Sequence, residues 1–302
     1  MKLVRFGPPG RERPGLVEPD GRLRDLSGVV TDIDADAISP AGLSRLSHID
    51  PRALPVVDEP VRFGPPVAGT RQFIAVGLNY ADHAAETGQP APTEPVLFTK
   101  AVSCIQGADD DVRKPRLSTK MDWEVELGIV IGTRASYVDR ENAGDHIAGF
   151  LIVDDLSERQ FQLERGPTWD RGKGCETFGP IGPWLVTSDE VGDPQQLDMW
   201  LDVNGQRMQT GNTRTMIFDC ATLVSHISEF MILLPGDIIT TGTPPGVGMG
   251  RNPPVWLREG DVIELGIEKL GRQRHTVVAW DHGRESIPSG ADDRPEARRK
   301  RM

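Results

Sequence analysis

Two glutamates separated by one residue stand in the stretch DWEVELGIVIG, which covers residues 122–132. If this stretch is a strand, Glu124 and Glu126 lie on one face with their carboxylates about 7 Å apart. The opposite face then carries the apolar residues Trp123, Val125, Leu127 and Ile129, an alternation typical of a half-buried strand. Two buried carboxylates this close repel each other, and a hard divalent cation would remove the repulsion by binding their oxygens. A solvated strand edge is the alternative for such a pair taken alone.

A third acid, Asp155, follows the apolar stretch 149–153, where a strand is predicted. Ser157 and Gln160 then predict a capping box that starts a helix. Asp155 therefore lies where a strand ends and a helix begins, a common place for site residues. We expect it to be the third oxygen ligand of a metal ion, although compensation of the helix dipole would also explain an acid here.

Three further stretches carry candidate chemistry. His83 and Glu86 are three residues apart on a short predicted helix. A carboxylate beside an imidazole raises its basicity and so builds a base that activates water, although a surface pair is the alternative. The glycine-rich loop 172–183 carries Lys173 but lacks the spacing of a phosphate-binding loop. The loop 242–250 can bring backbone N–H groups close to an anion.

The chain has 302 residues with 33 Gly and 25 Pro, which favours a protein rich in strands and loops. We expect a small N-terminal domain over residues 1–68, a catalytic domain over 69–280 and a disordered polar tail over 281–302. The larger domain is predicted to contain a hairpin at Asn204-Gly205 and one longer helix within 216–231.

The net charge of −11 disfavours binding to nucleic acids and to acidic membranes. The three cysteines form no CxxC pair, which favours reduced thiols in a cytoplasmic protein. Neither a signal peptide nor an apolar run near the ~20 residues of a membrane span is expected from the sequence.

Five motifs, taken in order, resemble the fumarylacetoacetate hydrolase family, and together they span about residues 70–265. They are GxNYxxHxxE at 77–86, DWExEL at 122–127, DxSxRxxQ at 155–162, GKxxxTxxP at 172–180 and TGTPxGVG at 241–248. The stretches 172–183 and 209–218 are most similar to members called 2,4-diketo-3-deoxy-L-rhamnonate hydrolases, close relatives of which carry the label ureidoglycolate lyase.

The resemblance implies an α+β fold that is mostly β, a mixed rolled β-sandwich with a small N-terminal domain, usually as a homodimer. It also assigns roles to individual residues. Mg²⁺ or Mn²⁺ is held by Glu124, Glu126 and Asp155. His83 and Glu86 match the water-activating pair, and Lys173 matches the lysine that stabilises developing negative charge. The substrate-binding positions are matched by Arg159, Gln162 and Thr243. Asp154 stands where relatives often have Asn.

The implied activity is hydrolysis of a C–C bond in a small 2,4-dioxo acid, an acylpyruvate such as a 2,4-diketo-3-deoxy sugar acid. The products are pyruvate and a second acid. A ureidoglycolate lyase, or a decarboxylase, tautomerase or dehydratase of 2-oxo acids, remains open on the same scaffold. A module that binds a metal or a sugar acid without catalysis is a further alternative. The water-activating pair favours hydrolysis, because a decarboxylation needs no attacking water.

Overall fold

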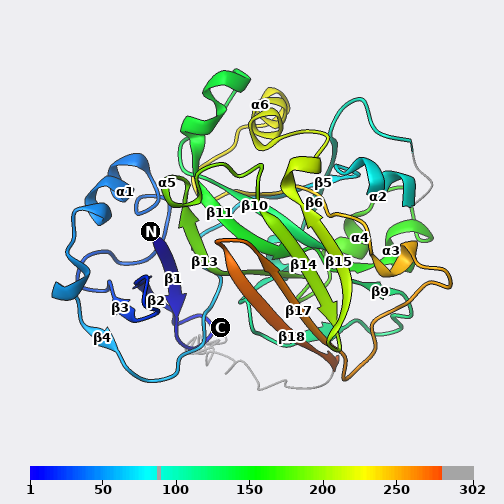
Figure 1. Cartoon of the computed structure of the whole chain (residues 1–302), viewed down its shortest axis with the longest axis horizontal. Coiled ribbons are helices and arrows are strands. Elements are labelled where there is room, and N and C mark those ends of the chain that lie inside the picture. The colour runs from blue at the N-terminus through cyan, green and yellow to red at the C-terminus, as the bar shows by residue number, and fades with distance from the viewer. Residues whose placement is uncertain (87–89, 281–302) are drawn as a thin grey trace, which may run out of the picture.

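Two packed β-sheets form most of the molecule (Figure 1). The computed structural model describes residues 1–86 and 90–280, with the side chains of residues 83–85 left out. The larger sheet has eleven strands in the order β4-β3-β2-β1-β13-β11-β10-β16-β5-β6, with β7 beside β13. Their bounds are β1 (Lys2–Phe6), β2 (Arg13–Val17), β3 (Leu23–Asp25), β4 (Val56–Val57), β5 (Phe73–Gly77), β6 (Val96–Lys100), β7 (Ile105–Gln106), β10 (Val125–Ile131), β11 (Ile147–Asp154), β13 (Gly179–Thr187) and β16 (Ile238–Thr240).

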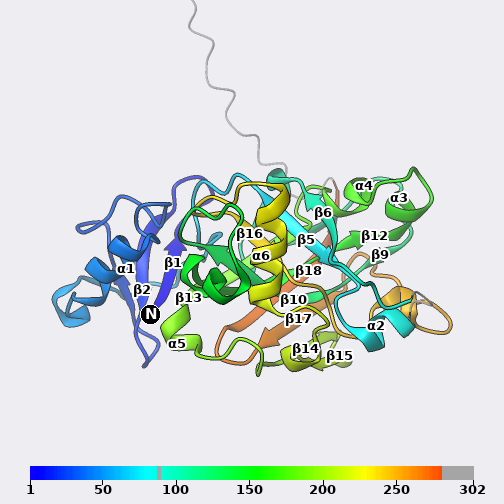
Figure 2. The same cartoon turned by 90° about the horizontal axis from the view of Figure 1, so that it is seen from above.

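The second sheet has five strands in the order β15-β14-β17-β18-β8, and it lies on one side of the larger sheet (Figure 2). Its strands are β8 (Val112–Lys114), β14 (Asp198–Val203), β15 (Gln206–Asn212), β17 (Val262–Ile267) and β18 (Gly271–Ala279). A two-stranded sheet joins β9 (Met121–Asp122) to β12 (Ser157–Glu158). The mixed, mostly β architecture confirms the predicted fold class.

Short helices connect the strands. They are α1 (Pro40–Ser47), α2 (Ala81–Glu86), α3 (Arg159–Leu163), α4 (Asp170–Lys173), α5 (Ser188–Val191) and α6 (Cys220–Phe230), with 3₁₀ turns at η1 (Pro51–Ala53), η2 (Val102–Cys104), η3 (Arg140–His146), η4 (Thr213–Thr215) and η5 (Gly248–Gly250). In the part of the chain that the structure describes, none of these helices has the length and apolar character needed to cross a membrane.

Strand β10 lies between β11 and β16, antiparallel to both, and all seven of its residues are buried. The prediction of a half-buried strand is therefore wrong. Leu201 of β14 and Leu265 of β17 belong to the same apolar cluster as Leu127 of β10. The second sheet thus packs on the apolar face of β10, as the alternation predicts. The opposite side is buried as well, because Glu124 contacts Arg159 and Lys173. Glu126 accepts from Thr240 Oγ1 and Gly242 N of the segment that ends and follows β16.

The N-terminal strands continue the larger sheet, because β1 pairs antiparallel with β13. They also have a small apolar cluster of their own, made by Val4, Phe6, Val17 and Leu23. The division into domains at residue 68 stays a prediction, and the tail 281–302 lies outside the described residues.

Several local predictions are confirmed, and one is wrong. The Asn204-Gly205 hairpin joins β14 to β15, and the helix expected within 216–231 is α6. The expected capping box at Ser157 does not form. Ser157 lies in β12, and the Glu158 side chain caps α3 by accepting from Gln160 N.

Candidate active site

Pairing of β10 with β11 brings the predicted acids together. Val125 lies opposite Asp154, and the backbone N–H of Asp155 donates to the carbonyl of Glu124 at 2.9 Å. One carboxylate oxygen from each of Glu124, Glu126 and Asp155 lies within 4.8 Å of the other two. These residues are 4%, 2% and 1% exposed. Three buried carboxylates this close suit a hard divalent cation, which binds oxygen ligands and offsets their charge. The structure therefore supports the sequence-based expectation of a metal site.

Three buried cations surround the acids. Lys173 Nζ donates to Glu124 and to Asp155 Oδ2, the latter at 2.7 Å. Lys100 Nζ lies 2.6 Å from Asp155 Oδ1 and donates to the carbonyl of Lys173 at 2.6 Å. Arg159 Nη2 donates to Glu124 Oε1 at 2.6 Å. The two oxygens of Asp155 thus face two different lysines.

Acid–base equilibria in the cluster follow from burial and from neighbouring charges. Burial raises the pKa of Glu126 well above its usual range, and the nearby Asp155 and Glu124 carboxylates raise it further. Burial opposes the charge of Arg159 and Lys100, but their carboxylate partners outweigh that effect, so that the pKa of each is raised. Repulsion among the acids is therefore only partly offset by the protein's own cations.

Hydrogen bonds from β16 and the segment after it fix the carboxylate of Glu126. Glu126 Oε2 accepts from Thr240 Oγ1 at 2.5 Å and from Gly242 N at 2.8 Å. Thr243 Oγ1 donates to the carbonyl of Val125 at 2.9 Å. The segment that follows β16 is therefore joined to β10 at the acids.

The predicted substrate-binding residues meet the acids in one hollow of about 410 Å³. Arg159, Gln162 and Thr243 line it together with Lys173 and the three carboxylates. Arg159 Nη1 donates to Gln162 Oε1 at 3.0 Å, so that these two residues of α3 form one polar unit. Arg159, Gln162 and Thr243 thus lie in the same hollow as the acids, and their roles in substrate binding stay predictions.

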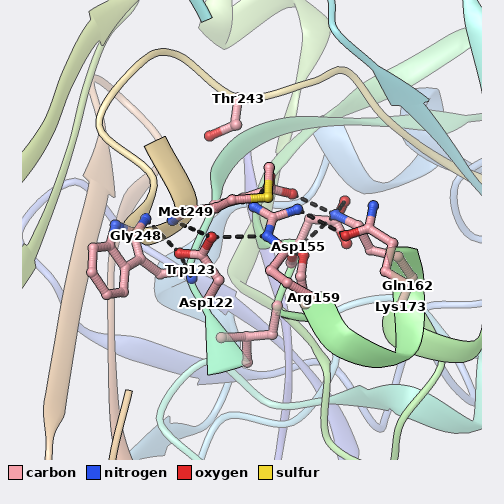
Figure 3. A network of polar contacts seen from close by, with 12 residues as sticks. Asp122, Trp123, Asp155, Arg159, Gln162, Lys173, Thr243, Gly248 and Met249 are labelled. Carbon is pink, nitrogen blue, oxygen red and sulfur yellow. Dashed lines mark hydrogen bonds and ion pairs between the residues drawn. The ribbon is translucent and has the colours of Figure 1, made fainter. Parts of the chain in front are cut away.

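Asp122 links the loop after β16 to Arg159 (Figure 3). Its carboxylate accepts from Gly248 N at 2.6 Å, from Met249 N at 3.0 Å and from Arg159 Nε at 2.8 Å. A Cβ on Gly248 would lie 2.7 Å from Asp122 Oδ1 and 2.1 Å from a backbone oxygen, so the approach needs glycine. Asp122 therefore fixes the Arg159 guanidinium relative to Gly248 and Met249, and Met249 lines the hollow.

Glu86, the last residue of α2, contacts the same loop but is not among the residues that line the acid hollow. Its carboxylate accepts from Gly246 N at 3.1 and 3.0 Å, and it lines a neighbouring surface hollow with Gly250 and Arg251. The side chain of His83 lies outside the described residues. The water-activating role of this pair stays a prediction.

Two functional candidates were missed at the sequence level. Lys100 ends β6 as a single lysine in PVLFTK, with no partner at helical or strand spacing. Asp122 stands at the start of the acidic stretch, where its spacing indicates no role of its own. Both owe their position to long-range packing, since Lys100 is 55 residues from Asp155 and Asp122 is 37 residues from Arg159.

Comparisons with known proteins agree over almost the whole chain. Residues 72–278 match the family model described as "Fumarylacetoacetate (FAA) hydrolase C-terminal". A Burkholderia multivorans protein named "Putative hydrolase" is 57% identical over 90% of this chain and 97% of its own length.

Two solved structures are also similar. The fumarylacetoacetate hydrolase from Exiguobacterium antarcticum superposes with a TM-score of 0.83 at 37% identity, covering 92% of this chain and 99% of its own. The maleylpyruvate hydrolase from Sphingobium sp. SYK-6, solved with manganese(II) and pyruvate, superposes with a TM-score of 0.76 at 31% identity, covering 92% and 99%.

Proposed function

The chain belongs to the fumarylacetoacetate hydrolase family, and from this premise we propose that it is a metal-dependent hydrolase of small 2,4-dioxo acids. The observation that carries the proposal is the buried triad of Glu124, Glu126 and Asp155, set among Lys173 and Arg159. The similar structure that contains manganese(II) and pyruvate supports both a metal ion and a 2-oxo acid in such a fold.

The triad would hold Mg²⁺ or Mn²⁺ through carboxylate oxygens. When bound, the ion supplies Lewis acidity and positive charge at the 2-oxo acid end of the substrate. The remaining chemistry belongs to side chains of this protein.

Arg159 and Gln162 orient the substrate. The Gln162 carbonyl accepts from Arg159, which leaves the amide NH₂ of Gln162 as a donor for a substrate oxygen. Asp122 keeps the Arg159 guanidinium in place through its Nε. Because Thr243 is fixed to the carbonyl of Val125, it presents its hydroxyl at a constant position in the hollow.

In the reaction, water attacks the 4-carbonyl carbon and the bond between C3 and C4 breaks. The electron pair moves into the enolate of pyruvate, which then takes a proton at C3, and the acyl group leaves as a carboxylic acid. Lys173 stabilises the enolate, because its ammonium lies beside the acids and the new negative charge appears only as the bond breaks. Glu86, acting with His83, takes the proton from the attacking water.

Glu86 is joined to the site through the loop after β16. Gly246 of that loop donates to its carboxylate, and Met249 of the same loop lines the acid hollow. In the proposed mechanism, Glu86 and His83 act from this wall of the hollow. The natural substrate within the acylpyruvate class, the homodimer and the cytoplasmic location stay predictions.

The first test is loss of the near-ultraviolet enol absorbance of acylpyruvates with Mg²⁺ or Mn²⁺, with product analysis. Pyruvate and an equal amount of a carboxylic acid support hydrolysis, whereas release of CO₂ would assign a decarboxylase. Glu86→Gln should lower kcat by about 10²–10⁴ while metal affinity is kept. Glu94→Gln, an exposed glutamate on the following segment, is the matched control. Unchanged turnover in Glu86→Gln would remove Glu86 from the mechanism.

A further inference from the structure

Part of the lining of the acid hollow is apolar. It consists of Val76, Leu78, Phe98, Leu163, Trp169 and Met249. The rings of Phe98 and Trp169 meet edge to face, with their centroids 5.2 Å apart at an interplanar angle of 65°. Lys173 Nζ lies 5.2 Å from the Phe98 ring centroid. The aromatic pair therefore begins directly beside the lysine that contacts the acids, within the same hollow.

The aromatic pair is held in fixed relation to Lys173. Trp169 precedes α4, which ends at Lys173, and Phe98 lies in β6. Thr99 Oγ1 donates to Asp170 Oδ1 at 3.0 Å and so ties β6 to α4. A Cβ on Gly77 would lie 2.5 Å from the Trp169 ring, which shows that the indole packs directly on the end of β5. The wall is thus built from three elements of the fold rather than from one loose side chain.

The cations that line this hollow, among the described residues, are Arg159 and Lys173. Arg159 is paired with Asp122 and Glu124, and Lys173 is paired with Glu124 and Asp155. A second carboxylate placed against Phe98 and Trp169 would lose water, and the nearest cation of this lining, Lys173, already pairs with two of the acids. Binding a carboxylate there is therefore unfavourable. An apolar group placed there would gain from leaving water.

We propose that the preferred substrates are 2,4-dioxo acids whose acyl end is apolar and uncharged, bound with that end against Phe98 and Trp169. This inference rests on the proposed function and narrows its substrate class. The oxo acid end lies at Glu124, Glu126 and Asp155. Specificity then comes from the aromatic wall, which accepts alkyl groups and rejects an acyl group that ends in a carboxylate.

The test compares acetylpyruvate, butanoylpyruvate and succinylpyruvate with Mn²⁺. Succinylpyruvate differs from butanoylpyruvate by a carboxylate in place of the terminal methyl group. Two extra buried CH₂ groups should raise kcat/KM for butanoylpyruvate about tenfold over acetylpyruvate. The terminal carboxylate should lower kcat/KM at least tenfold relative to butanoylpyruvate.

Two variants test the wall itself. Trp169→Ala should reduce the preference for butanoylpyruvate over acetylpyruvate, a ratio that a general loss of folded protein does not change. Leu163→Lys adds a cation at a half-exposed position of the lining and should raise the ratio of succinylpyruvate to butanoylpyruvate turnover at least tenfold. Leu117→Lys is the control, because Leu117 is 87% exposed and does not line the hollow.

The two proposals fail in different ways. Turnover of succinylpyruvate equal to or faster than that of butanoylpyruvate, or a butanoyl-to-acetyl ratio unchanged in Trp169→Ala, would overturn the apolar assignment and leave the hydrolase intact. No turnover of any of the three acids with Mg²⁺ or Mn²⁺ would overturn the proposed function together with this inference.

Discussion

Lys100→Met removes the ammonium group that lies against Asp155 and keeps an unbranched side chain of similar length. Lys100 is 2% exposed, and its Nζ is 2.6 Å from Asp155 Oδ1. It also donates to the carbonyl of Lys173 at 2.6 Å. The substitution therefore takes one positive charge from the acid cluster and one hydrogen bond from the backbone that carries the other lysine.

Two effects of opposite sign follow. In the metal-free protein, loss of one partner of a buried ion pair should lower the free energy of unfolding by about 3–5 kcal/mol. Metal binding should change in the other direction, because the lysine and the ion compete for Asp155. Two unit charges about 5 Å apart interact by about 3 kcal/mol at an effective dielectric constant of about 20. We therefore expect Lys100→Met to bind Mn²⁺ at least tenfold more tightly than the wild type.

The assay combines calorimetric titration with Mn²⁺ and thermal unfolding in its presence and absence. The Tm of Lys100→Met should be far below that of the wild type without metal, and the difference should become smaller in excess Mn²⁺. Lys114→Met is the matched control, because its Nζ is 3.8 Å from Glu259 and the pair lies at the surface, where such pairs contribute about 1 kcal/mol or less. Folded Lys100→Met protein whose Mn²⁺ affinity equals or falls below that of the wild type would refute the reasoning.

Three further predictions concern the same structure. Asp122→Asn should lower kcat/KM at least tenfold and lower Tm. The asparagine NH₂ group cannot accept a hydrogen bond, so that one of the N–H groups of Gly248 and Met249 loses its acceptor. Steady-state kinetics measures kcat/KM and far-ultraviolet circular dichroism measures Tm, and a wild-type kcat/KM would contradict the prediction. Mn²⁺ at 100 times its Kd should stabilise the wild type by about 2.7 kcal/mol and Glu126→Ala far less, and equal shifts in Tm would remove Glu126 from the metal site. Burial lowers the pKa of His275 to about 4. Below about pH 6.5 the unfolded chain binds a proton at His275 that the folded protein does not bind. The free energy of unfolding should therefore fall by about 3 kcal/mol between pH 6.5 and 4. Urea unfolding measured across this range should show a smaller fall for His275→Asn.

The acid triad could be predicted from the sequence because alternation in a strand depends on neighbouring residues. Glu124 and Glu126 share a face for that reason, and Asp155 follows a recognisable apolar strand. The DxSxRxxQ motif identifies Arg159 and Gln162, which lie on α3 and line the same hollow as the acids. The motif order then fixed the family.

The errors and omissions have long-range causes. Burial of both sides of β10 depends on contacts from other parts of the chain, which periodicity within the strand does not report. The second sheet covers the apolar face, whereas Lys173 and the segment after β16 contact the glutamates. Ser157 looked like a helix cap, but it pairs with Asp122 in a short strand, and Glu158 takes the cap position. Lys100 gives no local signal, because its partners come from Asp155, just after β11, and from α4 only after folding.

The pairing of β1 with β13 has a consequence for any attempt to isolate the part that carries the acids. Lys2 and Leu3 of β1 lie opposite Val186 and Leu185 of β13. Removal of the first strands would therefore take a hydrogen-bonded neighbour from β13 and expose its backbone amides and carbonyls at a new sheet edge. An exposed sheet edge can pair with strands of other polypeptides and so promotes aggregation. The first strands therefore act as a protective margin, and a shortened protein lacking them should precipitate even though every acid and lysine of the hollow is still encoded.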